Sequence, residues 1–298
     1  MESALGARSE TGEPSLLRPP PARVYRGETV IRPSAASFDV QLREFWRYRH
    51  LFMALVWRNV RVEFAATRLG SAWAVARPLL LGLVFGLFRN FSGADTRVDE
   101  VPYLLYVYSG LLLWFYFTDA AQNSALAIRL DSGLLTKVYY PRLITPCVPM
   151  ISGLTSLFIG LFPLVVMMAW YGVYPTFAII LLPLALLPSL MLALGLGMVV
   201  SSLSITNRDW ERVLAFVLTI ALWFSPVVYA PDMIPEDLRW VYHLNPMIGP
   251  LLGFRASLFY GVSVPYAEWA YALASSLVVL ALGIWTFRRT EIRLVDRL

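Results

Sequence analysis

The sequence is poor in charged residues and has almost no lysine. Only 15% of its 298 residues are charged, against about 25% in a typical soluble domain, and 58% are hydrophobic. It has 24 arginines and one lysine, Lys137, compared with 20 acidic residues. A soluble fold could not bury so much apolar surface, and a soluble nucleic-acid-binding protein would keep more polar residues. The composition therefore indicates a membrane protein, with anionic head groups rather than nucleic acid as the partner of the basic excess.

Cysteine and histidine are almost missing. The single cysteine, Cys147, excludes an intramolecular disulfide, and its apolar surroundings are typical of a small core residue. His50 and His243 are far apart, so no zinc-type spacing exists and no metal is expected. No apolar segment follows the first methionine, so residues 1–41 are predicted to form a flexible cytoplasmic tail rather than a cleaved signal.

Catalytic patterns are also lacking. A nucleotide-binding P-loop needs glycines around the phosphates and a lysine that reaches them, but residues 133–136 before Lys137 lack that pattern. No Ser-His-Asp set or carboxylate pair is suggested by spacing. The chain is therefore predicted not to be an enzyme and to hold no cofactor of its own.

Long apolar runs are abundant. A helix needs about 20 residues to cross a hydrocarbon core, and no alternating barrel pattern is present. The sequence thus predicts an all-α integral membrane protein whose transmembrane domain, residues 71–298, has six transmembrane helices. These are Ser71–Phe91, Tyr103–Ala127, Leu143–Tyr171, Pro175–Ile205, Val213–Ala230 and Tyr266–Phe287.

The basic residues near these spans are unevenly distributed. Twelve lie on the side that holds both termini and four on the other, a bias that places both termini in the cytoplasm. The twelve are Arg58, Arg61, Arg68, Arg129, Lys137, Arg142, Arg208, Arg212, Arg288, Arg289, Arg293 and Arg297, and the four are Arg89, Arg97, Arg239 and Arg255.

Two segments outside the spans are also predicted to be helical. Apolar residues recur at three- and four-residue steps in residues 42–70, which predicts an N-terminal amphipathic interfacial helix. Pro231–Gly261 is too polar and too rich in proline to cross the membrane. It is expected to form a re-entrant outer-leaflet hairpin between spans five and six, two short helices joined at Asn245-Pro246.

Several motifs together resemble the O-antigen and teichoic-acid ABC exporter permeases (Wzm/TagG-like). The resemblance runs in order from Leu42 to Leu298. Three positions depart from the family pattern: Arg77 replaces a usual Gln, Asp119 stands where Asn is common, and Glu63–Ala66 replace a basic run. The motifs are Leu55-Val56-Trp57-Arg58-Asn59-Val60, Arg68-Leu69-Gly70-Ser71-Ala72-Trp73, Val107–Trp114, Leu135–Arg142, Phe224–Tyr229, Ile234-Pro235, Leu244-Asn245-Pro246 and Gly253-Phe254-Arg255.

This resemblance implies the partners and the location. The chain is expected to pair with a second copy of itself and with two copies of a cytoplasmic ABC ATPase subunit, which binds ATP and magnesium. The implied function is export of a lipid-linked polysaccharide, such as O-antigen or teichoic acid, across the bacterial inner (plasma) membrane, in contact with membrane lipids. Two alternatives stay open: a drug or small-lipid exporter of the same fold, and a membrane enzyme acting on lipid-linked sugars.

The candidate passage residues are mainly aromatic. Sugars stack on aromatic rings, so ring-lined walls suit a sliding polymer, although most membrane aromatics face lipid or the interfaces. Spans one and five of two subunits are expected to line a continuous channel. The predicted passage residues are Trp114, Phe115, Tyr116, Phe117, Asp119, Trp223, Phe224, Trp240 and Tyr242.

Basic residues supply two further predicted sites. Arginine forks match phosphate oxygens, so lipid-phosphate contacts are predicted at Arg58, Arg61, Arg68 and Arg77, with solvated or snorkelling arginines as the alternative. The segment after span two is predicted to dock on the ATPase, unless it is a plain surface loop. Its coupling residues are Lys137, Tyr139, Tyr140 and Arg142. Gly195 and Gly197 are expected to permit close helix packing.

Overall fold

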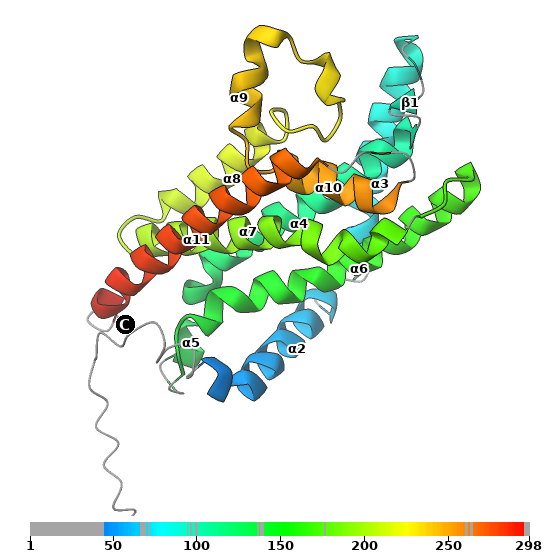
Figure 1. Cartoon of the computed structure of the whole chain (residues 1–298). Helices are drawn as coiled ribbons and strands as arrows, with labels where there is room; N and C mark the ends of the chain where they lie inside the picture. The colour runs from blue at the N-terminus through cyan, green and yellow to red at the C-terminus, as the bar shows by residue number, and fades with distance from the viewer. Residues whose placement is uncertain are drawn as a thin grey trace, which may run out of the picture. The chain divides into compact units, whose positions relative to one another are not determined.

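The computed structural model describes residues 45–298 except 66–69, 71, 94, 96, 99–100, 136, 138–139, 176, 260–261, 263–264 and 295–298. The predicted tail, residues 1–41, lies outside the described residues. Helices dominate the described part, and one two-residue antiparallel ladder, β1 (Arg97–Val98) with β2 (Val101–Pro102), is present as well (Figure 1). The helices are α2 (Arg49–Ala65), α3 (Ala72–Phe91), α4 (Tyr103–Leu130), α5 (Ser132–Leu135), α6 (Ile144–Tyr171), α7 (Leu182–Ser204), α8 (Asp209–Ala221), α9 (Arg239–His243), α10 (Ile248–Leu258) and α11 (Tyr266–Leu294), with short 3-10 turns at Phe177–Leu181, Pro231–Met233 and Glu236–Leu238.

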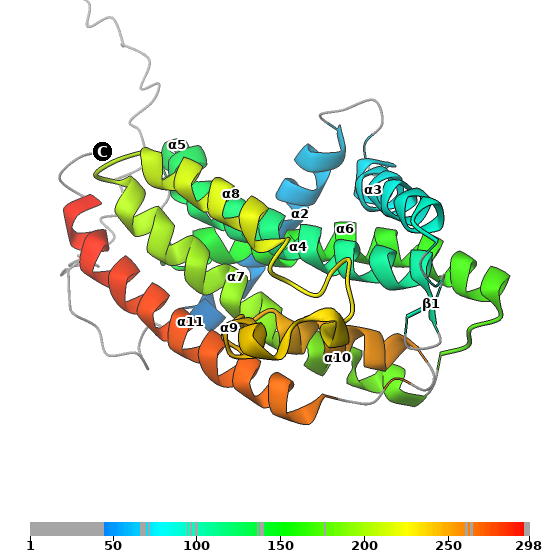
Figure 2. The same ribbon diagram turned by 90° about the horizontal axis from the view of Figure 1, so that it is seen from above.

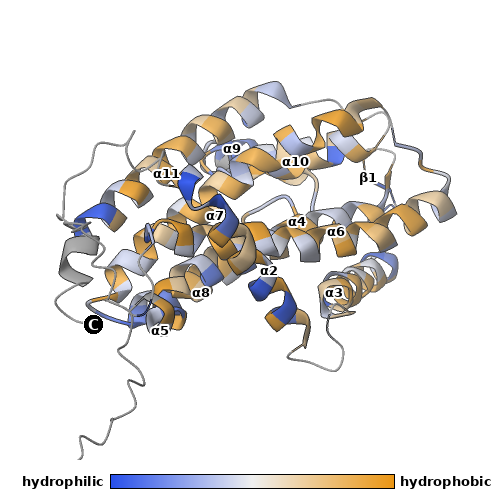
Figure 3. Ribbon diagram, turned by 90° about the horizontal axis from the view of Figure 1, so that it is seen from below, coloured by the Kyte–Doolittle hydropathy of each residue, from blue (hydrophilic) through white to orange (hydrophobic). Residues whose placement is uncertain are grey.

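Five helices in the described part are long and apolar enough to cross a membrane. They are α3, α4, α6, α7 with the turn that precedes it, and α11. Each begins and ends within a few residues of a predicted span, apart from α11, which continues to Leu294. Figure 3 shows hydrophobic colouring along α3, α6 and α11, with hydrophilic residues at the far end of α11 and on α2.

The fifth predicted span, Val213–Ala230, is wrong as a continuous helix. Helix α8 has 13 residues and ends at Ala221, and the chain continues in turns through residues 222–229. Pro226 has no N–H to donate and disfavours helical geometry in the residue before it. At 1.5 Å per residue α8 is about 20 Å long, shorter than a hydrocarbon core of about 30 Å.

Helix α4 is the centre of the bundle. Most of its side chains are buried, and it packs against α3, α6, α7, α8 and α10. Hydroxyl groups of α4 also donate to backbone carbonyls of α6, a continuous helix that contains Pro149 and Pro163. Such bonds satisfy the hydroxyl donors, which would otherwise be buried without a partner. The bonds join Tyr108 to Gly160 at 2.9 Å, Tyr116 to Met150 at 3.0 Å and Ser124 to Pro146 at 2.8 Å.

Helices α7 and α11 cross in close contact at two glycines. A Cβ atom on Gly195 would lie 2.7 Å from the Leu280 nitrogen, and one on Gly283 would lie 2.6 Å from the Gly195 oxygen. A Cβ on Gly197 would lie 2.5 Å from Ser124 Cβ on α4. The prediction that Gly195 and Gly197 permit close packing is confirmed.

The two ends of the bundle differ. Figures 1 and 2 both place α5 and the end of α11 at one end of the bundle, and β1 with the end of α6 at the other.

Helix α2 packs against α6 and forms the middle of the predicted interfacial helix, residues 42–70. The expected pair of short helices around Asn245 is present as α9 and α10. Helix α10 is buried against α7 and α11.

Candidate functional site

A cavity of about 230 Å³ with a mixed polar and apolar wall opens among α2, α3, α4 and α6. Aromatic rings and groups that can form hydrogen bonds share its wall. They are Glu63, Phe64, Trp73, Arg77, Phe115, Tyr116, Asp119, Asn123, Ser152 and Ser156. The cavity therefore combines residues from the predicted interfacial helix with residues from three candidate spans.

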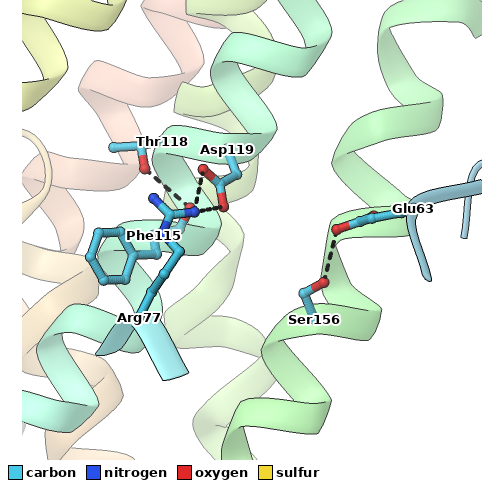
Figure 4. A network of polar contacts seen from close by, with 6 residues as sticks. All are labelled: Glu63, Arg77, Phe115, Thr118, Asp119 and Ser156. Atoms are coloured by element: carbon cyan, nitrogen blue, oxygen red, sulfur yellow. Dashed lines mark hydrogen bonds and ion pairs between the residues drawn. The ribbon is translucent and has the colours of Figure 1, made fainter. Parts of the chain in front are cut away.

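An ion pair joins α3 to α4 in this cavity. Arg77 Nη1 donates to the two carboxylate oxygens of Asp119 at 2.9 and 3.3 Å, and the guanidinium carbon lies 4.4 Å from the centre of the Phe115 ring (Figure 4). Both charged side chains are about half exposed, although each belongs to a candidate span. An ionisable group that faces hydrocarbon costs at least about 2.5 kcal/mol, so this wall is expected to face water, a polar ligand or another protein surface.

A second carboxylate enters the cavity from α2. Ser156 Oγ donates to Glu63 Oε1 at 3.2 Å, and Figure 4 shows the two side chains facing each other. Burial raises the pKa of Glu63, the hydrogen bond from Ser156 lowers it, and the nearby Asp119 charge raises it. The result is a raised pKa, so Glu63 takes up a proton more readily than an exposed glutamate does.

Two carboxylates and one guanidinium give the cavity wall an acidic excess. A phosphate bound by Arg77 would also meet Glu63 and Asp119, which would repel it. Sugar hydroxyls suit the same wall, because carboxylates accept their hydrogen bonds, Arg77 donates to them and rings cover their apolar faces. The predicted phosphate contact of Arg77 stays a prediction, one that this charge balance disfavours.

The predicted passage residues of α4 divide into two sets. Trp114 and Phe117 are buried inside the bundle, with their ring centres 5.6 Å apart. Phe115 and Tyr116 line the cavity, and the Tyr116 hydroxyl is engaged with α6. Only the second set is placed to meet a ligand in this arrangement of the chain.

The remaining predicted passage residues lie in the turns after α8 and in the hairpin. Trp223 and Phe224 are 60% and 63% exposed, and the Trp223 ring lies edge-on to Phe85 of α3, with ring centres 6.0 Å apart. Trp240 is exposed, whereas Tyr242 is buried beside His243. The structure thus brings Trp223 to α3 and leaves Tyr242 within the protein.

Besides Arg77, two of the predicted phosphate-binding arginines are engaged by the chain itself. Arg58 Nη2 donates to Asp131 Oδ1 at 2.6 Å, at the C-terminal end of α4. Arg61 lies 5.7 Å from the centre of the Trp57 ring, and Arg68 lies outside the described residues. Their role toward lipid phosphate stays a prediction.

The predicted ATPase-coupling residues follow α5. Lys137 is exposed, Arg142 is partly exposed, and Tyr139 lies outside the described residues. Tyr140 is buried in a cluster with Leu55 of α2 and residues of α6. This cluster connects the coupling segment to the predicted interfacial helix.

Arg255 is buried and forms several hydrogen bonds within the protein. It is one of the predicted outer-side cations, a prediction that its burial does not test, and it is 1% exposed within α10. Its Nη1 donates to the Pro226 carbonyl at 2.6 Å, and its Nη2 donates to the carbonyls of Val227 at 2.9 Å and Tyr106 at 3.0 Å. The guanidinium carbon also lies 3.5 Å from the Tyr106 ring centre. A lone arginine in an apolar helix without an acid was the signal that could have indicated buried partners.

Comparison with known proteins gives consistent results. The sequence profile of the ABC-2 type transporters matches residues 50–259. The O-antigen export system permease protein RfbA of Myxococcus xanthus is 30% identical over 255 residues, 84% of this chain and 96% of that protein. A protein of the same name from Klebsiella pneumoniae is 25% identical over 249 residues, 83% and 94% of the two chains. The polysialic acid transport protein KpsM of Escherichia coli is 25% identical over 251 residues, 80% and 92%.

These matches confirm the resemblance that the sequence motifs indicated. The profile covers more than half of the chain, and the relatives align over nearly their whole length. Both findings agree with a helical protein that has several candidate membrane spans. The chain belongs to the ABC-2 type transporter family.

Proposed function

We propose that the chain is the passage-forming membrane subunit of an exporter for a lipid-linked polysaccharide, driven by ATP hydrolysis on a separate subunit. Its relatives are named as O-antigen export permeases and a polysialic acid transport protein. The structural observation that carries the proposal is the half-exposed Arg77–Asp119 pair on two candidate spans. Lipid would not solvate that pair, whereas a hydrated polysaccharide passage would.

A second copy of the chain would enclose this passage. Helix α3 has only Pro78 and Gly82 buried, and its main contacts are with α4 and α6. Exposed side chains of α3, among them Leu80, Val84 and Phe88, are open in one chain together with Trp223 and Phe224. Two copies facing each other across α3 and the α8 turns would place these rings and the ion pair around one continuous path.

A sixth crossing is proposed at α8 and the turns that follow it. The turns after α8 expose four successive carbonyls, at residues 226–229, and each accepts a bond from a side chain of another helix. Arg255 serves the first two, Tyr103 donates to Val228 at 2.9 Å, and Tyr106 donates to Tyr229 at 3.1 Å. Non-helical backbone is tolerated at membrane depth where protein satisfies it. We therefore assign α8 with residues 222–229 as a sixth crossing, so that both termini lie on the same side of the membrane. The predicted excess of basic residues on that side assigns it to the cytoplasm, with α9 and α10 in the outer leaflet.

The segment between α5 and α6 is proposed to receive the ATPase. A cysteine at exposed Lys137, in a chain whose only native cysteine is changed by Cys147→Ala, would capture that subunit by crosslinking. The matched control is a cysteine at Trp240, an exposed residue of the hairpin. Capture from position 240 but not from position 137 would contradict the assignment.

The passage itself is tested by Trp223→Ala with Phe224→Ala. We expect slower export of lipid-linked glycan, with assembly and basal ATP hydrolysis near normal, because only wall contacts are removed. Trp170→Ala, which changes an exposed ring of α6, is the matched control. Unchanged export in the double variant would remove these rings from the passage wall.

A further inference from the structure

A second pocket of about 490 Å³ lies at the other end of α3 from the Arg77 cavity. It is formed by the last turns of α3, the β1–β2 ladder, the start of α4 and the end of α6. Arg89 and Arg97 line it, and no carboxylate does so among the described residues. Among the described residues, its charged lining is therefore basic, unlike that of the Arg77 cavity.

The chain holds Arg89 in place at this pocket. The guanidinium carbon lies 4.3 Å from the centre of the Tyr103 ring. Arg89 Nε donates to the Asp95 carbonyl, and Nη2 donates to the Arg97 carbonyl at 3.4 Å. The Asp95 carboxylate accepts a bond from the Arg97 backbone nitrogen at 3.1 Å, so this acid orders the turn that carries Arg97.

The wall beside the arginines is apolar and has room for an alkyl chain. Leu83 and Leu87 are exposed along α3, a candidate span. Between them, a Cβ atom on Gly86 would meet nothing within 4 Å, whereas one on Gly82 would contact Leu104. A cationic end joined to an open apolar wall matches an amphiphile with an anionic head.

We propose that this pocket binds the phosphate head group of a membrane lipid, whose alkyl chain lies over Leu83, Gly86 and Leu87. Arg89 and Arg97 supply the charge-assisted donors to the phosphate. The site rests on α3 lying in a membrane and does not depend on which substrate the protein exports.

The test is native mass spectrometry of the delipidated full-length chain in detergent, titrated with phosphatidylglycerol. Diacylglycerol with the same acyl chains tests the need for phosphate, and inorganic phosphate as competitor tests the need for a lipid. The variants are Arg89→Gln, Arg97→Gln and Gly86→Leu, with Arg239→Gln as the matched control for an exposed arginine of the hairpin. Arg97→Gln keeps the backbone carbonyl that Arg89 uses, so it leaves that contact in place.

We expect saturable binding of phosphatidylglycerol by the unchanged chain and by Arg239→Gln, and none of diacylglycerol. Replacing either pocket arginine should weaken binding by about fivefold, because one basic residue beside an anionic lipid contributes about 1 kcal/mol. Gly86→Leu should abolish binding with thermal unfolding unchanged. Equal binding by Arg97→Gln and the unchanged chain would overturn the proposal. Full displacement of phosphatidylglycerol by inorganic phosphate would also overturn it. A Gly86→Leu variant that no longer forms dimers but still binds the lipid would overturn it as well.

Discussion

Replacing Arg255 by leucine should destabilise the protein strongly. The side chain is 1% exposed and its three bonds serve the carbonyls of Pro226, Val227 and Tyr106. A hydrogen bond to a charged group contributes about 1.5–3 kcal/mol, and each buried acceptor left without a donor costs about 1–3 kcal/mol. The cost of burying the guanidinium offsets part of this sum, so we expect a net loss of about 3–5 kcal/mol.

The assay is reversible unfolding in mixed detergent micelles, followed by tryptophan fluorescence. Limited proteolysis should show cleavage in residues 222–229 first, because the backbone of that segment loses its donors. Arg255→Lys should lose less stability, since one ammonium retains the charge but cannot reach three carbonyls as a guanidinium does. A loss below about 1 kcal/mol for Arg255→Leu would refute the reasoning.

Gly110 offers an independent check on the same cluster. A Cβ atom there would collide with Arg255 Nη2 and lie 3.0 Å from the Val227 oxygen. Gly110→Ala should therefore destabilise the protein, and its effect should not add to that of Arg255→Leu, because both changes break the same bonds. Additive losses would mean that the two residues act separately.

Other positions give contrasting expectations. Gly195→Ala should cost about 1–3 kcal/mol by overpacking against the Leu280 backbone, whereas Gly133→Ala, with open space at Cβ, should change thermal unfolding little. Arg129→Gln should lose less than about 1 kcal/mol in the same measurement, because the arginine of its 2.7 Å pair with Glu211 is half exposed. Equal melting of the two glycine variants, or a large loss at Arg129, would contradict these readings.

The sequence predicted those helices that are determined by a local property, the length of an apolar run. Long apolar runs located α3, α4, α6 and α11 because length and hydrophobicity alone determine such spans. The prediction of a continuous helix at Val213–Ala230 was wrong because the run is apolar throughout, yet Pro226 prevents helical bonding inside it. The donors that make the resulting turns possible come from α4 and α10, far away in sequence.

The sequence indicated which residues belong to the candidate site, but not which of them contact one another. Arg77 and Asp119 were noticeable as charges inside apolar runs, but 42 residues separate them, and no pattern indicates that they meet. The contribution of Glu63 depends on how α2 packs against α6, which sequence periodicity does not determine. Arg255 was noticeable as an outer-side cation and as part of a family motif, but no sequence pattern indicates its buried bonds to distant carbonyls.

Movement of glycan across a sealed membrane tests the central claim most directly. The chain and its ATPase would be reconstituted in vesicles loaded with lipid-linked polysaccharide, and an impermeant lectin would report glycan that reaches the opposite face. We predict that lectin binding appears only with both subunits and hydrolysable ATP, and that the glycan is chemically unchanged. ATP hydrolysis without lectin binding, or modification of the glycan by the chain alone, would contradict the account.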